Sequence, residues 1–490
     1  MMRSFIVFGL VLVSVAQAQF GPDVRVSDTT GGFFGCVSPW IAYHQGILYS
    51  VWASDYTGSF DCHIYFSKST DMGKTWAPGK RVDDATPPDA CLYPCLAVDP
   101  SGNLYCVWWE MLITNENEIL FSRSTDGGAT WAPSVRLDSS SYCTPPHITT
   151  RGGEIFVVWT TNTLPGCAFT KSTDGGTTWM PLIKVGGSSF FHAIAVFGDT
   201  IFVTHEKGDV YLSRSTDDGA TWQNMGRIND ITTGKQDYPD LALTPNGDIC
   251  CAWYDWSYGM CKIRFSKSTD GGVSWLPSVR ASDTIWSQSS TIGDLRMNLE
   301  CVDENRIYCL WHDFRTGSWD IFFTKSEDGG VNWSEDIMVN DTAYVDSPQM
   351  MPCLCLEENG NPCVVWDDAR EGLGKVHIYF DKGEFPGIKE MASDYPLGNS
   401  LLLEVYPNPF GERVNIRWKI GDGRWKPEDI SLKIYDATGR LVKEFIPPTA
   451  STVISWDGRD ESGRKVRSGV YFLKFEAGDH RTTEKLLLVK

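Results

Sequence analysis

The residues of this sequence with the clearest chemical potential are acids that follow a tryptophan. Five segments share the pattern: WASDYTG with Asp55, WWEMLIT with Glu110, WYDWSYG with Asp255, WHDFRTG with Asp313 and Arg315, and WDDAREG with Asp367, Asp368 and Arg370. Carboxylates serve as general acids, general bases or Ca²⁺ ligands, and guanidinium groups hold carboxylates through paired hydrogen bonds. These side chains are therefore the first candidates for catalysis or ligand binding.

The regularity of the pattern favours a structural role. Catalysis at one centre needs a few unlike residues, whereas a residue that recurs in most repeats supports every repeat alike. We interpret W-x-D-x-R-x-G as a loop in which the Asp caps the backbone and the Arg pairs with the Asp. Several inward carboxylates could also bind Ca²⁺, although no contiguous calcium loop occurs. No other cofactor is expected.

A second motif shows which elements position these loops. The pattern S-x-D-x-G-x-[TSN]-W occurs six times, with its Asp at Asp71, Asp126, Asp174, Asp217, Asp270 and Asp328. Each copy follows a run of alternating apolar and polar residues and precedes another short extended segment, which predicts a β-turn between two strands. In such a turn the Asp accepts backbone hydrogen bonds, the Gly supplies a positive φ, and the Trp covers the turn.

The whole region repeats a four-stranded unit. Aligning it on the tryptophan of the second strand gives seven places, with FVTHE filling the one that lacks Trp: Trp52, Trp108, Trp159, 202–206, Trp253, Trp311 and Trp366. The seventh unit lacks its fourth strand, and Pro22–Ser27 resembles fourth strands elsewhere but has no unit before it. We therefore predict that an N-terminal strand completes the last unit and removes the open edges of a ring.

The octapeptide motif resembles the Asp-box of sialidase-like β-propellers, the BNR-repeat superfamily. This resemblance implies an all-β fold, a seven-bladed propeller by the repeat count or a six-bladed one as in sialidases, followed here by a small Ig-like sandwich. In that family the Asp-boxes are structural hairpins on the face away from the active site. The loops between second and third strands and the connections between units then face the ligand, and a site is expected among them near the axis.

The resemblance also implies a chemistry that can be compared with this chain. Sialidases hold the substrate carboxylate with three Arg and use a Tyr nucleophile helped by Glu and an Asp acid/base. The place of the first Arg reads Val37–Ile41 here and contains none. A different trio would be Arg296, Arg315 and Arg370, with Tyr238 or Tyr254 nearby. We predict a noncatalytic module that binds a glycan or an extracellular protein, with an exo-sialidase-type glycoside hydrolase as the alternative.

The N-terminus predicts export. A charged start, an apolar run from Phe5 to Val15 and the sequence Ala16-Gln17-Ala18 form a signal peptide over residues 1–18. No later run reaches the ~20 apolar residues of a membrane span. The net charge of −19 disfavours nucleic acid and anionic membrane surfaces as partners. The mature protein is therefore expected to be secreted or at the cell surface.

Fifteen cysteines in an exported chain suggest disulfides. Two separations are alike in their repeat position, and we predict the bridges Cys36–Cys62 and Cys143–Cys167. Cys106, Cys251 and Cys309 precede a strand Trp by two residues and are interpreted as core residues. There is no C-x-x-C pair, and the spacing of Cys91 and Cys95 does not predict a zinc site.

The C-terminal part differs from the repeats. Residues 19–385 are assigned to the propeller, 386–400 to a linker rich in Pro, Gly and Ser, and 401–490 to an Ig-like domain whose segments alternate like sandwich strands. The motifs Tyr406–Phe410, Tyr435–Arg440 and Gly469–Phe472 resemble the C-terminal sorting domain of type IX secretion cargo and the related domain of hook-assembly proteins. The resemblance implies that this domain engages the export machinery.

Overall fold

The computed structural model describes residues 19–28, 35–55, 62–85, 89–114, 116–164, 166–187, 189–286, 295–341, 347–372, 375–384, 401–406, 414–420, 430–436, 439–445, 453–477 and 480–488. The chain divides into two compact units, 1–385 and 386–490. The predicted signal peptide and the predicted linker lie outside the described residues. Across the described segments, no helix has the length and apolar character needed to cross a membrane.

The first unit contains seven antiparallel sheets among its described residues, numbered here in chain order. Sheet one contains β3 (Cys36–His44), β4 (Ile47–Ser54), β5 (His63–Ser69) and β6 (Lys80–Arg81). Sheet two contains β7 (Ala90–Val98), β8 (Leu104–Met111), β9 (Asn117–Ser124) and β10 (Val135–Ser140). Sheet three contains β11 (His147–Arg151), β12 (Glu154–Thr161), β13 (Gly166–Ser172) and β14 (Ile183–Lys184).

Sheets four and five contain β15 (Ala193–Phe197), β16 (Thr200–Glu206), β17 (Val210–Ser215) and β18 (Gln223–Arg227); and β19 (Gln236–Leu243), β20 (Ile249–Asp255), β21 (Lys262–Ser268) and β22 (Val279–Arg280), with the 3₁₀ turn η1 (Ser257–Gly259) between β20 and β21. Sheets six and seven contain β23 (Met297–Cys301), β24 (Ile307–Asp313), β25 (Asp320–Ser326) and β26 (Ile337–Met338); and β27 (Gln349–Leu356), β28 (Pro362–Asp368) and β29 (His377–Glu384).

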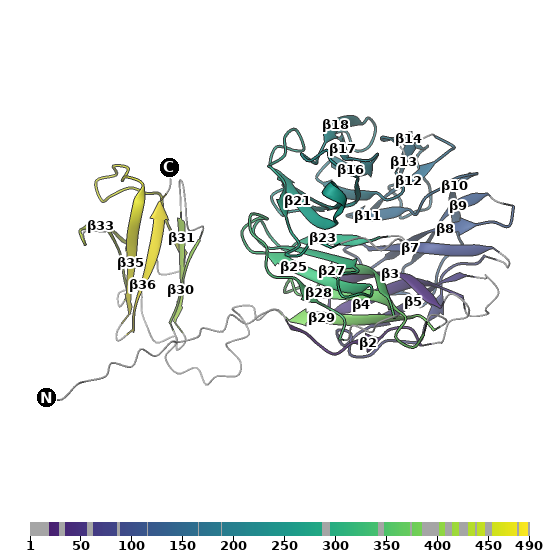
Figure 1. Ribbon diagram of the computed structural model, residues 1–490, viewed down its shortest axis with the longest axis horizontal. Coiled ribbons are helices and arrows are strands. Elements are labelled where there is room, and N and C mark those ends of the chain that lie inside the picture. Colours follow the sequence, from purple (N-terminus) through teal and green to yellow (C-terminus); the bar gives the residue numbers. More distant parts are fainter. Residues whose placement is uncertain are drawn as a thin grey trace. The chain divides into compact units, whose positions relative to one another are not determined.

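These sheets form a closed ring (Figure 1). The first strand of each sheet contacts the first strand of the next, in the order β3, β7, β11, β15, β19, β23 and β27, and β27 contacts β3. The outer edge of sheet seven is covered from the N-terminus by β1 (Gln19–Phe20) and β2 (Val24–Arg25), which both pair with β29. The predicted N-terminal closure is therefore present, and the all-β propeller fold is confirmed.

The core follows from the repeat pattern. Six second strands place a Trp at the same level, and all six are fully buried: Trp52, Trp108, Trp159, Trp253, Trp311 and Trp366. Each indole lies between neighbouring sheets, so one residue per repeat supplies much of the apolar surface that holds adjacent sheets together. Cys106, Cys251 and Cys309 are also fully buried, as the sequence predicts.

The Asp-boxes form compact turns after the third strands. In sheet two, Ser124 Oγ donates to Asp126 Oδ1 over 2.8 Å and accepts from Gly128 N over 2.9 Å. The Asp126 carboxylate also accepts from Thr130 N at 2.9 Å and from Thr130 Oγ1 at 2.6 Å. The same serine and aspartate contacts recur in the boxes of Asp71, Asp174, Asp217, Asp270 and Asp328.

The Asp-box also joins neighbouring sheets. Its Trp packs edge-on against a third-strand Phe of the preceding sheet, with ring centroids 4.9 to 5.5 Å apart in the pairs Trp76–Phe380, Trp131–Phe66, Trp179–Phe121, Trp222–Phe169 and Trp333–Phe265. The motif is thus both a turn and an inter-sheet contact, which explains its recurrence in six of the seven sheets.

Because Ser124 is buried and Asp126 is exposed, the serine is the acceptor whose loss should matter more. Replacing Ser124 by Ala leaves the buried Gly128 N–H without an acceptor and is expected to lower the free energy of unfolding by ~1–3 kcal/mol. Asp126→Ala is expected to have a smaller effect, and neither change should alter ligand affinity. Chemical denaturation monitored by Trp fluorescence measures both, and an Asp126→Ala loss above that of Ser124→Ala would contradict this assignment.

The predicted disulfides are wrong, since neither Cys36 and Cys62 nor Cys143 and Cys167 are joined by a disulfide. Cys36 pairs with Ser54 on β4, and β4 lies between β3 and β5, which Cys62 directly precedes. Cys143 and Cys167 likewise lie on opposite sides of β12. Two strand spacings separate the α-carbons by about 9–10 Å, which exceeds the ~7 Å limit of a disulfide. The shared repeat position reflected a shared place in the sheet.

The second unit is a sandwich of two antiparallel sheets. One contains β30 (Leu401–Tyr406), β31 (Val414–Ile420) and β34 (Val453–Trp456), and the other contains β32 (Ile430–Asp436), β33 (Leu441–Phe445), β35 (Gly469–Ala477) and β36 (His480–Leu488). Side chains of both sheets share one buried core, in which Trp456 packs edge-on against Tyr471. The predicted β-sandwich is confirmed.

Candidate functional site

The acids that follow the strand Trp by two residues are tied into local networks. Asp313 Oδ2 accepts from Trp311 Nε1 over 2.8 Å, and both oxygens of its carboxylate accept from Arg315. Sheet seven repeats this arrangement with Trp366, Asp368 and Arg370. A Ca²⁺ ion at these carboxylates would have to compete with the guanidinium groups that already neutralise them.

The remaining loop acids are also enclosed. Asp255 is fully buried, accepts from Gln236 Nε2 at 2.9 Å and from Ser257 N at 2.7 Å, and lies 3.3 Å from Lys262 Nζ. Asp55 is fully buried beside Gly35, whose carbonyl accepts its backbone N–H. Burial first, and then nearby carboxylates, raise the pKa of Glu110 to about 7.

The proposed arginine trio does not form one pocket. Arg315 is held by Asp313, Asp336 and Asp283 and lies over the ring of Phe322. Arg370 is held by Asp368 and Asp23 and lies over the ring of Tyr379. Only Arg296 of the three lines the cavity on the ring axis, where it is joined by Tyr238.

This cavity, the axial pocket, is built from the beginnings of the first strands and the residues just before them. Its walls include four aromatic side chains: Trp40, Tyr93 and Tyr238 of sheets one, two and five, and Phe191, which precedes sheet four. The pocket continues along the inner strands into a channel of about 480 Å³, with Trp40 and His147 bordering both spaces. The first strands begin on the side opposite the Asp-boxes, where the propeller pattern predicts a ligand site.

Four strained backbone positions lie in the first strands of the ring, and two of them line the pocket. A proline interrupts the first strand of four sheets, the strand pairing shifts there, and the preceding residue has a positive φ of 50° to 55°: Ser38, Tyr93, Tyr238 and Met351. A non-glycine residue in this region costs ~1–2 kcal/mol, and such strain clusters at functional sites. The bulges at Tyr93 and Tyr238 bring both rings into the pocket lining.

A third set of residues supports these bulges from the neighbouring sheet. Asp367 directly follows Trp366, and its Oδ2 accepts from Ser38 N over 3.1 Å. Glu206 occupies the equivalent position in sheet four, and its Oε2 accepts from Tyr238 N over 2.7 Å. Burial raises the pKa of each of these two carboxyls to about 7.

The same position supports the pocket in two more sheets. Thr160 follows Trp159, and its Oγ1 lies 2.9 Å from His192 Nε2. The Tyr254 hydroxyl lies within hydrogen-bond distance of two carbonyl oxygens, Arg296 O at 3.1 Å and His312 O at 3.0 Å. In sheets three, four and five, the residue directly after the strand Trp, or at the equivalent position, therefore contacts a pocket-lining residue of the next repeat. The acids two places after the Trp do not line the pocket.

The charges in the pocket are unlike. Arg296 is the only Lys or Arg among the described lining residues; its Nη1 donates to Pro39 O over 2.7 Å and its guanidinium lies 5.4 Å from the Trp40 ring centroid. Asp240 is buried and accepts from two backbone N–H groups, and burial raises its pKa to about 6. Burial lowers the pKa of His147 to about 4, so this imidazole is neutral at pH 7.

Sequence reasoning identified Arg296 and Tyr238 but missed the rest of the pocket. A usable signal was present in four proline-containing dipeptides at the same place of the first strand: Ser38-Pro39, Tyr93-Pro94, Tyr238-Pro239 and Met351-Pro352. Proline inside a strand marks a bulge or an edge. Its recurrence on the innermost strands therefore indicates a shaped axial opening.

Comparison with known families agrees with this architecture. Residues 46–296 match the BNR repeat-like domain family. The chain belongs to this family. Residues 404–490 match the secretion system C-terminal sorting domain, which implies engagement with the type IX export machinery and places the protein among secreted or cell-surface proteins.

Solved structures that are similar to this chain share little sequence identity with it. An ulvan lyase of polysaccharide lyase family PL25 is 12% identical over 76% of this chain and 100% of its own, with a TM-score of 0.53. A Dyadobacter fermentans protein of unknown function is 15% identical over 76% and 100%, with a TM-score of 0.48. The Hadza microbial sialidase Hz136 is 16% identical over 71% and 66%, with a TM-score of 0.44. No curated protein matches the chain.

Proposed function

We propose that this protein is a secreted or cell-surface module whose axial pocket binds a carbohydrate without cleaving it. The observation that carries the proposal is the pocket lining, in which Trp40, Tyr93, Phe191 and Tyr238 surround a single guanidinium, that of Arg296. Aromatic faces pack against the C–H surfaces of sugar rings, and a few placed polar groups fix the orientation of a ligand in such a pocket.

The contacts of the acidic residues in and near the pocket favour binding without catalysis. Asp367 and Glu206 accept backbone N–H groups of the bulges, and Asp240 accepts two more. Arg315 and Arg370 lie in ion pairs away from the pocket. A sialoside carboxylate would therefore meet one guanidinium where the sialidase resemblance implies three, which favours binding over turnover.

Calorimetric titration of the chain from residue 19 to 490 with neutral, uronate-containing and sialylated oligosaccharides tests the proposal. Tyr238→Ala is expected to weaken the affinity for a bound oligosaccharide at least ~10-fold, because a central aromatic contact is lost. Tyr258→Ala is the matched control, since Tyr258 also has a positive φ, of 60°, but is 81% exposed. No binding by the native chain, or equal losses in both variants, would contradict the proposal.

One observation favours a hydrolase as the second candidate. Tyr238 and Arg296 line the same pocket, and Glu206 contacts the Tyr238 backbone, so three residue types of the sialidase set lie close together. Release of sialic acid from a fluorogenic sialoside distinguishes the candidates. Release that disappears in a Tyr238→Phe variant would establish the hydrolase and overturn the binding module.

A further inference from the structure

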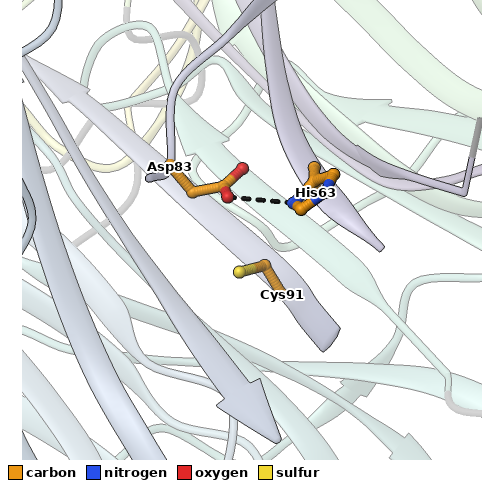
Figure 2. A group of neighbouring side chains, drawn as sticks. All are labelled: His63, Asp83 and Cys91. Atoms are coloured by element: carbon orange, nitrogen blue, oxygen red, sulfur yellow. Dashed lines mark hydrogen bonds and ion pairs between the residues drawn. The ribbon is translucent and has the colours of Figure 1, made fainter. Parts of the chain in front are cut away.

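Three side chains of types that commonly bind metals lie close together where sheets one and two join (Figure 2). His63 begins β5, Asp83 follows β6, and Cys91 is the second residue of β7. One ligand atom from each lies within 4.8 Å of the other two, and all three residues are buried. His63 Nδ1 and Asp83 Oδ1 are 3.0 Å apart. The three groups converge from separate strands and a connecting segment.

The equivalent residues in other sheets show the ordinary role of the position that Asp83 occupies. The carboxylate of Asp83 accepts from Ile64 N at 2.7 Å, as the amide oxygens of Asn229 and Asn340 accept from the equivalent N–H groups at 2.9 Å. These two Asn side chains also donate to Asp209 and Asp320, which stand where His63 stands. Capping therefore explains an Asn or Asp here, but it does not require an imidazole and a thiol beside it.

The place of Cys91 is taken by glutamine in the same two junctions. Cys91 N donates to Cys62 O at 2.8 Å, and Gln236 N and Gln349 N make the matching bonds to Gly208 and Trp319. The side chain of Gln236 accepts the indole N–H of Trp253 over 2.8 Å. In sheet two the equivalent indole, Trp108, is fully buried, and its N–H has no hydrogen-bond acceptor.

A thiolate at Cys91 would supply an acceptor for this N–H, although Trp52 Nε1 beside Cys36 lacks an acceptor as well. The Cys91 side chain is fully buried and lies beside the Asp83 carboxylate, a setting that opposes negative charge on its sulfur. A bound metal cation would stabilise the thiolate form of Cys91, because metals bind the thiolate and not the thiol. The thiolate would then accept the Trp108 proton, as outer hydrogen bonds do around metal ligands.

A further ligand stands close by. Glu110 lies directly opposite Cys91 in the pairing of β7 with β8, so both side chains project from the same face of the sheet. The cation already present is Arg81, whose Nη2 lies 2.8 Å from Asp83 Oδ1. Its side chain is 38% exposed, which leaves it free to turn toward solvent and give way to a metal.

We propose that His63, Asp83 and Cys91 form a Zn²⁺ site that joins sheets one and two, with Glu110 or water in the fourth position. Imidazole, carboxylate and thiolate are the ligand set that zinc accepts in tetrahedral geometry. On binding, the Cys91 thiol releases its proton to solvent, and His63 coordinates through Nδ1 with its proton on Nε2. The metal fixes the start of β7, two residues before Tyr93 of the axial pocket.

The junction of sheets seven and one provides a natural control. It contains His377 and Cys36 at the positions of His63 and Cys91, but Ser27 stands at the position of Asp83. This junction offers two ligands of the set instead of three. Cys36→Ser is therefore the matched control for Cys91→Ser.

The test uses the full mature chain, stripped with a chelator and titrated with Co²⁺ and then Zn²⁺. We expect one equivalent of Co²⁺ with tetrahedral d–d bands and a thiolate charge-transfer band, displacement by Zn²⁺, and a melting temperature that rises with Zn²⁺. Asp83→Asn should fold, because Asn caps the same N–H in two other sheets, yet its Zn²⁺ affinity should fall at least ~100-fold, as should that of Cys91→Ser.

The Cys36→Ser chain should keep the native cobalt spectrum and zinc affinity. A native chain with no charge-transfer band would overturn the proposal. So would a band that survives Cys91→Ser, since the other thiols would then be its source. The double variant His63→Asp, Asp83→Asn recreates the pair found at Asp209 and Asn229, and Zn²⁺-dependent stabilisation that persists in this folded variant would also refute the site.

Discussion

A loss of ~2–5 kcal/mol in the free energy of unfolding is expected when Gly128 of the second Asp-box is replaced by Ala. Gly128 has a φ of +81°, which disfavours any side chain, and a Cβ built there would lie 2.0 Å from Phe66 Cε1. The ring cannot easily withdraw. Phe66 is 2% exposed and packs between Tyr49 and Trp131.

The adjacent glycine separates the two causes of this loss. Gly127 has a φ of +65°, but its nearest neighbour to an added Cβ is Lys68 Nζ, the end of a flexible side chain, at 3.5 Å. Gly127→Ala should therefore cost only the backbone strain of ~1–2 kcal/mol. Urea denaturation of both variants measures the difference. Equal losses would show that the Phe66 contact contributes nothing and that backbone conformation alone requires the glycine.

This glycine shows how far the sequence predicts the fold and where it stops. The motif predicts a turn with positive φ, and the turn is present in each Asp-box. It does not predict that the ring of the preceding sheet occupies the space above the glycine. The same approach recurs at Gly73 on Phe380, Gly176 on Phe121, Gly219 on Phe169, Gly272 on Leu212 and Gly330 on Phe265. Such contacts join residues that belong to different repeats, and Gly73 and Phe380 lie near opposite ends of the ring-forming chain, so local pattern carries no trace of them.

The sequence pattern pointed to the strand position next to the one that supports the axial pocket. The sequence drew attention to acids two places after the strand Trp, such as Asp313 and Asp368, because they recur. Successive strand residues point to opposite faces, so these acids turn toward the buried indole and its Arg partner. The position directly after the Trp instead contacts a first-strand bulge or a pocket-lining residue of the next repeat, and there the residue types differ between sheets, as Glu206 and Asp367 against Thr160 show.

The zinc ligands illustrate a second limit. Sequence spacing finds metal sites whose ligands share one short segment, and Cys91 with Cys95 did not fit such spacing. His63, Asp83 and Cys91 come from three separate elements, and only the register of sheets one and two brings them together. The repeat itself supplied the missing information, because aligned junctions show which polar residues are ordinary at each position.

The second large loss of stability is expected when the ion pair of Asp368 and Arg370 is broken. Asp368 is fully buried and accepts from Trp366 Nε1 at 3.0 Å, from Arg370 Nε at 3.0 Å and from Arg370 N at 2.8 Å. Arg370 also holds Asp23 beside β2. The pair therefore connects the second strand of sheet seven with the N-terminal segment that closes the ring.

Asp368→Ala is expected to lower the free energy of unfolding by ~3–5 kcal/mol, because a largely buried guanidinium and a buried indole N–H lose their acceptor together. Amide exchange at Val24 and Arg25 should accelerate, since Arg370 also anchors the segment that carries β2. Asp368→Asn should lose less, because it keeps an acceptor for Trp366. Glu327→Ala, which breaks the exposed pair with Lys325, should change stability by less than ~1 kcal/mol. If Asp368→Ala proved as stable as Glu327→Ala, the ion pair of Arg370 would not contribute to the stability of the fold. Arg370 would then be available to bind a ligand, and a sialidase-type set of three arginines would no longer be disfavoured.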